Sequence, residues 1–182
     1  VGFDNIDLTA ATQKKIVVTN TPGALEHAVA EHTFALMMAV TRRIVEADQF
    51  MRARKYRSWD PVLFLGMELQ GKTLGIVGLG RIGMGVAQRA AKGMGMNVVY
   101  YDVQRNTNFE KMYGARFVSL NFLLKTADVV SVHVPLLPST RHLIGKKELR
   151  QMKTTAYLIN TSRGPVLDEK ALVLALRKNW IA

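Results

Sequence analysis

The sequence of 182 residues contains no cysteine. It therefore offers no disulfide, no cysteine nucleophile and no thiolate ligand, and we predict no metal site. Any redox chemistry then requires a cofactor that the chain binds. The absence of cysteine also fits a reducing compartment, and we expect a cytoplasmic protein.

Long apolar runs are missing as well. No stretch reaches the roughly 18 consecutive apolar residues of a membrane-spanning helix, and the first residues do not resemble a signal peptide. We therefore expect no membrane partner. The chain opens without an initiator Met and closes at Trp180-Ile181-Ala182, directly after a helical pattern. We expect it to be an excised piece of a longer protein, with one sizeable core.

Acidic residues are scarce relative to basic ones: 14 Asp and Glu against 25 Lys and Arg give a formal net charge of +11. Clustered basic residues can bind nucleic acid by neutralising its phosphates. The densest basic run, residues 52–57, is short and belongs to no nucleic-acid-binding signature. It is more typical of a solvated helix end or a subunit contact, so we expect no nucleic-acid partner.

From residue 74 onward, short β-branched runs alternate with helical patterns. We predict strands over residues 74–77, 98–101, 129–134 and 156–160, and helices over 81–94 and 120–127. Asp168 should cap a last helix through Lys178 that buries Leu172, Ala175 and Leu176. The strands are apolar on both faces, which favours an α/β fold with a doubly wound parallel sheet.

The first part of the chain carries a predicted strand over residues 16–19 and a long helical pattern over 26–52. That helix is apolar around much of its circumference from residue 34 to 45, so it needs cover on more than one side. A single core could supply the cover. A subunit interface, extended by the apolar segment 61–65, would supply it equally well.

Residues 66–73, Gly-Met-Glu-Leu-Gln-Gly-Lys-Thr, match the phosphate-binding P-loop pattern. A P-loop functions between a strand and a helix, whose N-terminus presents backbone N–H groups to the phosphates. Here Lys72 and Thr73 lead into a predicted strand. We therefore predict no ATP or GTP site.

A second motif, Gly78-Leu79-Gly80-Arg81-Ile82-Gly83, lies between a predicted strand and a predicted helix. Its first Gly permits a tight turn, the second admits a pyrophosphate, and the third lets helix and strand pack closely. Asp102 ends the next strand at about the expected spacing of roughly 20 residues and would bind the adenosine ribose hydroxyls. Arg105 softens the resulting preference for NAD over NADP. The motif predicts a Rossmann-like dinucleotide-binding domain that takes NAD, with NADP possible.

Five blocks of the sequence resemble the D-isomer-specific 2-hydroxyacid dehydrogenases: residues 1–7, 19–33, 69–83, 133–140 and 158–164. The opening block and Phe64-Leu65-Gly66 are most similar to the glyoxylate and hydroxypyruvate reductase branch. The resemblance implies a two-lobed enzyme. Residues 1–24 would end the substrate lobe and form the hinge, and residues 25–182 would be an NAD-binding domain that is incomplete at its C-terminal end. The helix from Glu26 would help to build a homodimer.

The resemblance also assigns roles to single residues. Arg163 would be the catalytic arginine, and the backbone N–H groups of Val1 and Gly2 would bind the substrate carboxylate. Arg163 follows a strand, and its guanidinium fork can hold the carboxylate and polarise the carbonyl of a 2-oxo acid. The predicted cofactor-binding residues are Gly78, Leu79, Gly80, Arg81, Ile82, Gly83, Asp102, Pro135, Thr140, Thr161 and Ser162.

We therefore predict that the parent protein reduces a small 2-oxo acid, such as glyoxylate or hydroxypyruvate, to the D-2-hydroxy acid with NADH. In the family, a catalytic Glu and a proton-donating His follow the last helix, and this chain ends before them. None of the four His replaces that donor, which is worth roughly 10²- to 10⁴-fold, so the chain alone should be nearly inactive. A corepressor branch of the family keeps the same glycines and arginine, which leaves a dinucleotide-sensing module without turnover as the alternative.

Overall fold

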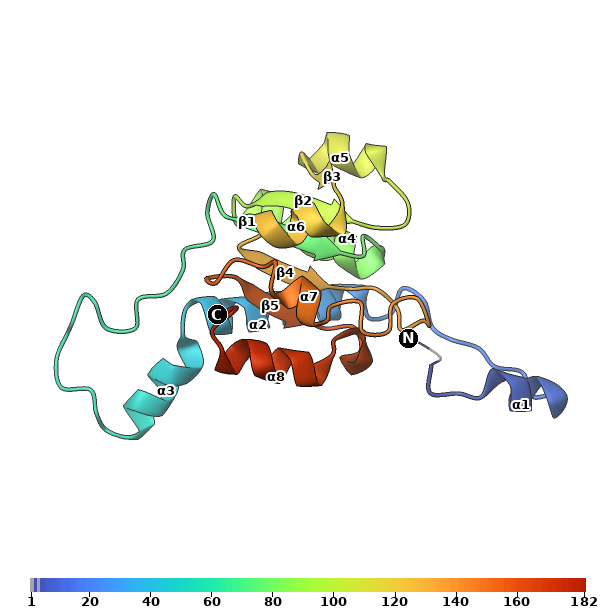
Figure 1. Cartoon of the computed structure of the whole chain (residues 1–182), viewed down its shortest axis with the longest axis horizontal. Helices are drawn as coiled ribbons and strands as arrows, with labels where there is room; N and C mark the ends of the chain where they lie inside the picture. Colours follow the sequence, from blue (N-terminus) through green and yellow to red (C-terminus); the bar gives the residue numbers. More distant parts are fainter. Residues whose placement is uncertain (1, 3) are drawn as a thin grey trace.

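Five parallel strands form one sheet at the centre of the molecule in the computed structural model, which describes residue 2 and residues 4–182 (Figure 1). The strands are β1 (Thr73–Val77), β2 (Asn97–Tyr101), β3 (Arg116–Phe117), β4 (Val129–Val132) and β5 (Tyr157–Asn160). Their order is β3-β2-β1-β4-β5, with every neighbouring pair parallel. The prediction missed β3, which is too short to show a periodicity, and placed the end of β4 two residues late.

The described helices are α1 (Leu8–Gln13), α2 (Glu26–Thr41), α3 (Ile44–Arg52), α4 (Arg81–Gly93), α5 (Thr107–Tyr113), α6 (Leu120–Thr126), α7 (Lys146–Leu149) and α8 (Glu169–Arg177). All of them except α1 and α3 cover the two faces of the sheet. One core lies between the sheet and α2, α4 and α5, and a second lies between the sheet and α6, α7 and α8. The doubly wound fold is confirmed. Among the described residues, no helix has the length and apolar character that a membrane span requires.

The strand side chains divide between the two cores as the apolar runs predicted. In β1, Leu74 and Ile76 face the α4 side and Val77 faces the α6 side, and all three are fully buried. β1 follows Lys72 directly, and the segment after it is strand, not helix. The predicted strand after Lys72, on which the rejection of a P-loop at residues 66–73 rests, is thereby confirmed.

The last helix begins as predicted, because the carboxylate of Asp168 accepts the backbone N–H of Ala171 at 3.1 Å. Its buried face differs from the prediction. Ala171 and Ala175, one turn apart, point into the core, Leu172 is half-buried, and Leu176 is exposed. Leu176 follows Ala175 by a rotation of about 100° around the helix, which turns it to solvent.

The predicted helix over residues 26–52 is two helices, α2 and α3, separated at Arg43, whose φ is 54°. The segment after α3 causes the break. The carbonyl of Thr41 at the end of α2 accepts the backbone N–H of Met67 at 2.7 Å. Gly66 lies so close that a Cβ there would overlap the same carbonyl oxygen. A contact from a distant segment therefore ends α2, and the helical pattern alone could not reveal it.

The predicted strand over residues 16–19 does not form. Ile16 is exposed and Val17 is 86% exposed, and no described strand pairs with this segment. Figure 1 shows that α1 and the chain around it extend away from the sheet on one side, while α3 and the loop after it extend on another. Both segments lie outside the two cores.

Candidate functional site

The glycine turn, residues 78–83, joins β1 to α4 at the carboxyl end of β1. The connection from β1 leads to β2 on one side, and the connection from β3 crosses to β4 on the other side of β1, which makes this the switch point where doubly wound folds bind ligands. Gly78 has a φ of 97°, and a Cβ on Gly83 would overlap the Gly78 carbonyl oxygen. A Cβ on Gly80 would meet nothing within 4 Å, and no described side chain caps α4 there. The turn therefore leaves the N-terminus of α4 accessible to an anion such as a pyrophosphate.

Asp102 follows β2 and contacts the glycine turn directly. Its Oδ2 accepts the backbone N–H of Leu79 at 2.6 Å, and its Oδ1 accepts that of Gln104 at 3.2 Å. A carboxylate with two such partners still has lone pairs for ribose hydroxyls. Asp102 lines a cavity of about 450 Å³ together with Leu79, Gly80 and residues 104–108; we call it the Asp102 cavity. The two halves of the predicted dinucleotide motif thus meet in space.

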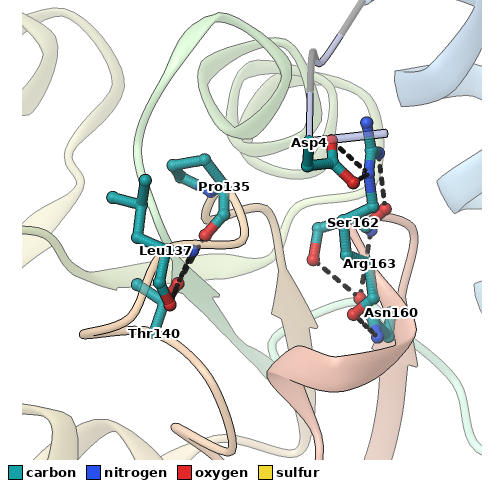
Figure 2. Close-up of polar contacts among 7 residues, drawn as sticks. All are labelled: Asp4, Pro135, Leu137, Thr140, Asn160, Ser162 and Arg163. Atoms are coloured by element: carbon teal, nitrogen blue, oxygen red, sulfur yellow. Dashed lines mark hydrogen bonds and ion pairs between the residues drawn. The ribbon is translucent and has the colours of Figure 1, made fainter. Parts of the chain in front are cut away.

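Arg163 lies in the loop that follows β5, and Asn160 at the end of β5 shapes this loop (Figure 2). The Oδ1 of Asn160 accepts the backbone N–H of Ser162 at 3.0 Å and its hydroxyl at 2.9 Å. The Nδ2 of Asn160 donates to the carbonyl of Arg163 at 3.0 Å. The backbone under the arginine is therefore fixed on both sides.

The guanidinium of Arg163 is oriented by Asp4. Its Nε donates to the two carboxylate oxygens of Asp4 at 3.0 and 2.9 Å, and its Nη1 donates to the carbonyl of Ser162 at 3.0 Å (Figure 2). The hydrogen bond from Arg163 lowers the pKa of Asp4 and keeps it ionised. Sequence reasoning missed Asp4. The feature that could have identified it is a carboxylate beside the predicted substrate turn.

The predicted substrate-binding residue Gly2 lies against this arginine, because a Cβ on Gly2 would overlap Nη2 of Arg163. The structure thus brings Gly2 and Arg163 together. Val1, the other predicted substrate contact, lies outside the described residues.

A cavity of about 310 Å³ extends from Arg163 and Asp4 toward the glycine turn, which it meets at Ile82; we call it the Arg163 cavity. Pro135 and residues 161–162, which are among the predicted cofactor-binding residues, line it as well. Thr140 is not among the lining residues, but it contacts two residues that are. Its hydroxyl donates to the carbonyl of Pro135 at 2.6 Å and accepts the N–H of Leu137 at 2.8 Å (Figure 2).

A chain of polar side chains in mutual contact connects the lining of the Arg163 cavity with the buried core. The hydroxyl of Thr161 lies 2.9 Å from that of Thr33 on α2 and 3.5 Å from Nδ1 of His133. The Nε2 of His133 lies 2.8 Å from the hydroxyl of Ser131. Thr33 and Ser131 are fully buried. We call these four residues the polar chain. Sequence reasoning missed it, although Ser131 is a polar residue within an otherwise apolar strand.

His133 was predicted to belong to a strand and lies just past the end of β4, where its backbone N–H donates to Val77 at 2.8 Å. Burial lowers the pKa of its imidazole to about 4, so the ring is neutral at pH 7. Within the described part of the chain, no three His, Asp or Glu side chains gather as a metal site would require.

Comparison with known proteins agrees with this geometry. Residues 34–182 match the family described as D-isomer specific 2-hydroxyacid dehydrogenase, NAD binding domain. The whole chain is 54% identical to a glyoxylate reductase of Korarchaeum cryptofilum and covers 55% of that protein. The chain therefore spans about half the length of the curated relatives it matches.

Solved structures give the same result. The TT0316 protein from Thermus thermophilus superposes with a TM-score of 0.90 at 48% identity, over 97% of this chain and 55% of that one. The D-lactate dehydrogenase of Aquifex aeolicus, in complex with NAD and lactic acid, superposes with a TM-score of 0.88 at 38% identity, over 99% of this chain and 53% of that one. The chain belongs to the D-isomer specific 2-hydroxyacid dehydrogenase family and carries its NAD-binding domain.

Proposed function

We propose that the full-length protein reduces a small 2-oxo acid, such as glyoxylate or hydroxypyruvate, to the D-2-hydroxy acid with NADH. One observation carries this proposal: Arg163 and the glycine turn border the same cavity at the carboxyl edge of the sheet. A charged donor is therefore available beside the position that a bound dinucleotide would occupy. The identity of 54% to a glyoxylate reductase supports the substrate class.

We assign different roles to the nitrogen atoms of the Arg163 guanidinium. Asp4 and the Ser162 carbonyl engage Nε and Nη1, which fixes the plane of the guanidinium. Nη2, next to Gly2, is the part of the fork that we assign to the substrate. There its charge would hold the carboxylate and stabilise the negative charge that develops on the carbonyl oxygen. Bound NADH would supply the hydride.

The glycine turn and Asp102 fit the dinucleotide. The open N-terminus of α4 favours a pyrophosphate, and Asp102 accepts ribose hydroxyls. His133 is neutral at pH 7 and holds Thr161, so we do not assign it as the proton donor. We propose that this donor belongs to the part of the relatives that the chain does not cover.

Replacing Arg163 by Lys in the full-length protein tests the proposal. We expect kcat/KM for glyoxylate to fall by at least about 100-fold, because Lys cannot reproduce the oriented fork. The Kd for NADH, measured by nucleotide fluorescence, should stay within about twofold. Arg177→Lys, at the exposed end of α8, is the matched control. Full turnover by the Arg163 variant would contradict the assignment, and NADH binding by the wild type without oxo-acid turnover would favour the dinucleotide-sensing alternative.

We also propose that residues 1–24 end the substrate lobe and form the hinge to the NAD-binding domain at residues 25–182. α1 carries no buried residue, and Ile16 and Val17 are exposed. Apolar side chains in such positions are usually covered by another part of the protein. The remainder of a substrate lobe would cover them.

A homodimer is the third part of the proposal. α3 and the loop after it extend from the sheet (Figure 1) and carry exposed apolar side chains, among them Trp59 at 79% and Val62. A second copy would bury them. Light scattering on the full-length protein should give the mass of a dimer, and Trp59→Ser with Val62→Ser should shift it toward the monomer. Val103→Ser, at a position outside this segment that is even more exposed, should leave the mass unchanged.

A further inference from the structure

Arg105 borders the Asp102 cavity but is engaged by a carboxylate of the next helix. Its Nε donates to Oε1 of Glu110 at 2.9 Å, and its Nη2 donates to Oε2 at 2.8 Å. Two parallel bonds of this kind make a bidentate pair, which is stronger than a single contact. The guanidinium is therefore drawn onto α5.

Glu110 is the fixed member of this pair. Its side chain is 14% exposed, whereas that of Arg105 is 60% exposed. The hydroxyl of Tyr100, a fully buried residue, donates to Oε1 of Glu110 at 2.8 Å and accepts the backbone N–H of Asn106 at 2.7 Å. The hydrogen bonds from Arg105 and Tyr100 lower the pKa of Glu110 and keep it ionised. These contacts hold the Glu110 carboxylate in place, and the more exposed Arg105 side chain extends toward it.

Asp102 and an unpaired Arg105 would favour different dinucleotides. A carboxylate suits the two ribose hydroxyls of NAD, and an unpaired guanidinium suits the 2′-phosphate of NADP. We propose that Glu110 is a specificity-determining residue for the cofactor. By neutralising Arg105, Glu110 withholds from the Asp102 cavity the cation that would otherwise bind a 2′-phosphate. This inference rests on the proposed function only in requiring that the site binds NAD(H).

The variant Glu110→Gln tests the inference in the full-length protein. Gln keeps the size of the side chain and can accept the Tyr100 hydrogen bond, but it carries no charge to hold Arg105. We expect the affinity for NADPH relative to NADH, from fluorescence titrations of both, to rise about tenfold, which is the worth of one charge-assisted hydrogen bond. Glu169→Gln, on α8 beside the opposite edge of the sheet, should leave the ratio unchanged.

Two further variants make the outcome specific to Arg105. In Arg105→Gln/Glu110→Gln the gain should disappear, and a gain that persists would overturn the inference, because net charge would then explain it. Arg105→Gln alone should keep the wild-type ratio within about twofold, since a neutralised arginine contributes little. A tenfold loss of NADPH affinity in that variant would also overturn the inference, even if Glu110→Gln failed to fold.

The inference and the proposed function can fail separately. Every readout for the inference is a ratio of binding affinities, whereas the proposed function is tested by turnover. A wild type that binds NADH without reducing glyoxylate would remove the proposed function alone. An unchanged ratio in a folded Glu110→Gln variant, checked by circular dichroism, would remove the inference alone.

Discussion

The two cavities beside the glycine turn are built in different ways. The Asp102 cavity is formed by residues 79–80, 102 and 104–108, which follow two neighbouring strands. The Arg163 cavity combines the loops after β4 and β5 with residues 2 and 4, and its central ion pair joins side chains 159 positions apart. Under the proposed function, recognition of the dinucleotide is thus encoded locally, whereas the reacting end depends on contacts between distant segments.

The two cavities also differ in what stabilises them. The Arg105–Glu110 ion pair at the Asp102 cavity is partly exposed to solvent, which screens it. The Arg163 cavity rests on the polar chain, where Thr33 and Ser131 are fully buried and His133 is neutral. Protonation in such surroundings is costly. The reacting end should therefore respond more strongly to acid than the dinucleotide end does.

The pH dependence of unfolding tests this difference and has the largest expected effect. Burial lowers the pKa of His133 from 6.5 to about 4 in the folded protein, so the unfolded chain takes up the proton first. The free energy of unfolding should fall as the pH decreases from 6.5 to 4, by up to about 3 kcal/mol from this residue, and rise again on return to pH 7. Urea titrations at pH 7, 5.5 and 4 would measure the loss.

His133→Gln separates this contribution from that of other groups. Gln can still reach the Ser131 hydroxyl but does not titrate, so the decrease between pH 6.5 and 4 should shrink by the same amount. His27→Gln, at an exposed position of α2, should keep the wild-type decrease. If the His133 variant lost as much stability as the wild type over this range, the polar chain would not be the acid-sensitive element.

Gly83→Ala affects the turn that both cavities share and has the next largest expected effect. The added Cβ would overlap the Gly78 carbonyl, which must move together with the N-terminus of α4. Overpacking of this kind costs roughly 1–3 kcal/mol. The pyrophosphate requires the turn in its original shape, so binding must restore the overpacked arrangement, and NADH should bind about 30-fold more weakly in a fluorescence titration. Gly93→Ala, at the end of the same helix, adds a Cβ that meets nothing within 4 Å. Equal NADH affinity in the two variants would show that close packing at Gly83 is not required.

The contrast between the cavities explains how much the sequence could predict. The apolar runs located four of the five strands, and the spacing from Gly83 located Asp102, because each signal lies within one element or one βαβ unit. Resemblance to the family, rather than pattern, pointed to Arg163. Its position on the sheet edge agrees with that assignment.

Contacts between distant segments escaped prediction. Thr33 and Thr161 are 128 positions apart, and nothing in a helical pattern distinguishes a threonine that supports a loop from one that faces solvent. The end of α2 depends in the same way on Met67. Periodicity indicates which face of an element is buried, but not which residue of another segment lies against it.

Asp4→Asn has the smallest expected effect and acts at the reacting end alone. Asn can still accept one hydrogen bond from Nε of Arg163, but it loses the charge and the second oxygen, so the guanidinium is oriented less firmly. We expect kcat/KM for glyoxylate to fall about tenfold, because a charge-assisted bond is worth roughly 1.5–3 kcal/mol and only part of it is lost. The Kd for NADH and the NADPH to NADH affinity ratio should not change, since the Asp102 cavity contains neither residue. Asp7→Asn on the same segment, a cap of α1, serves as the control. A parallel loss of NADH affinity in the Asp4 variant would mean that the two cavities are coupled through the glycine turn, and the division between a local and a long-range site would then have to be abandoned.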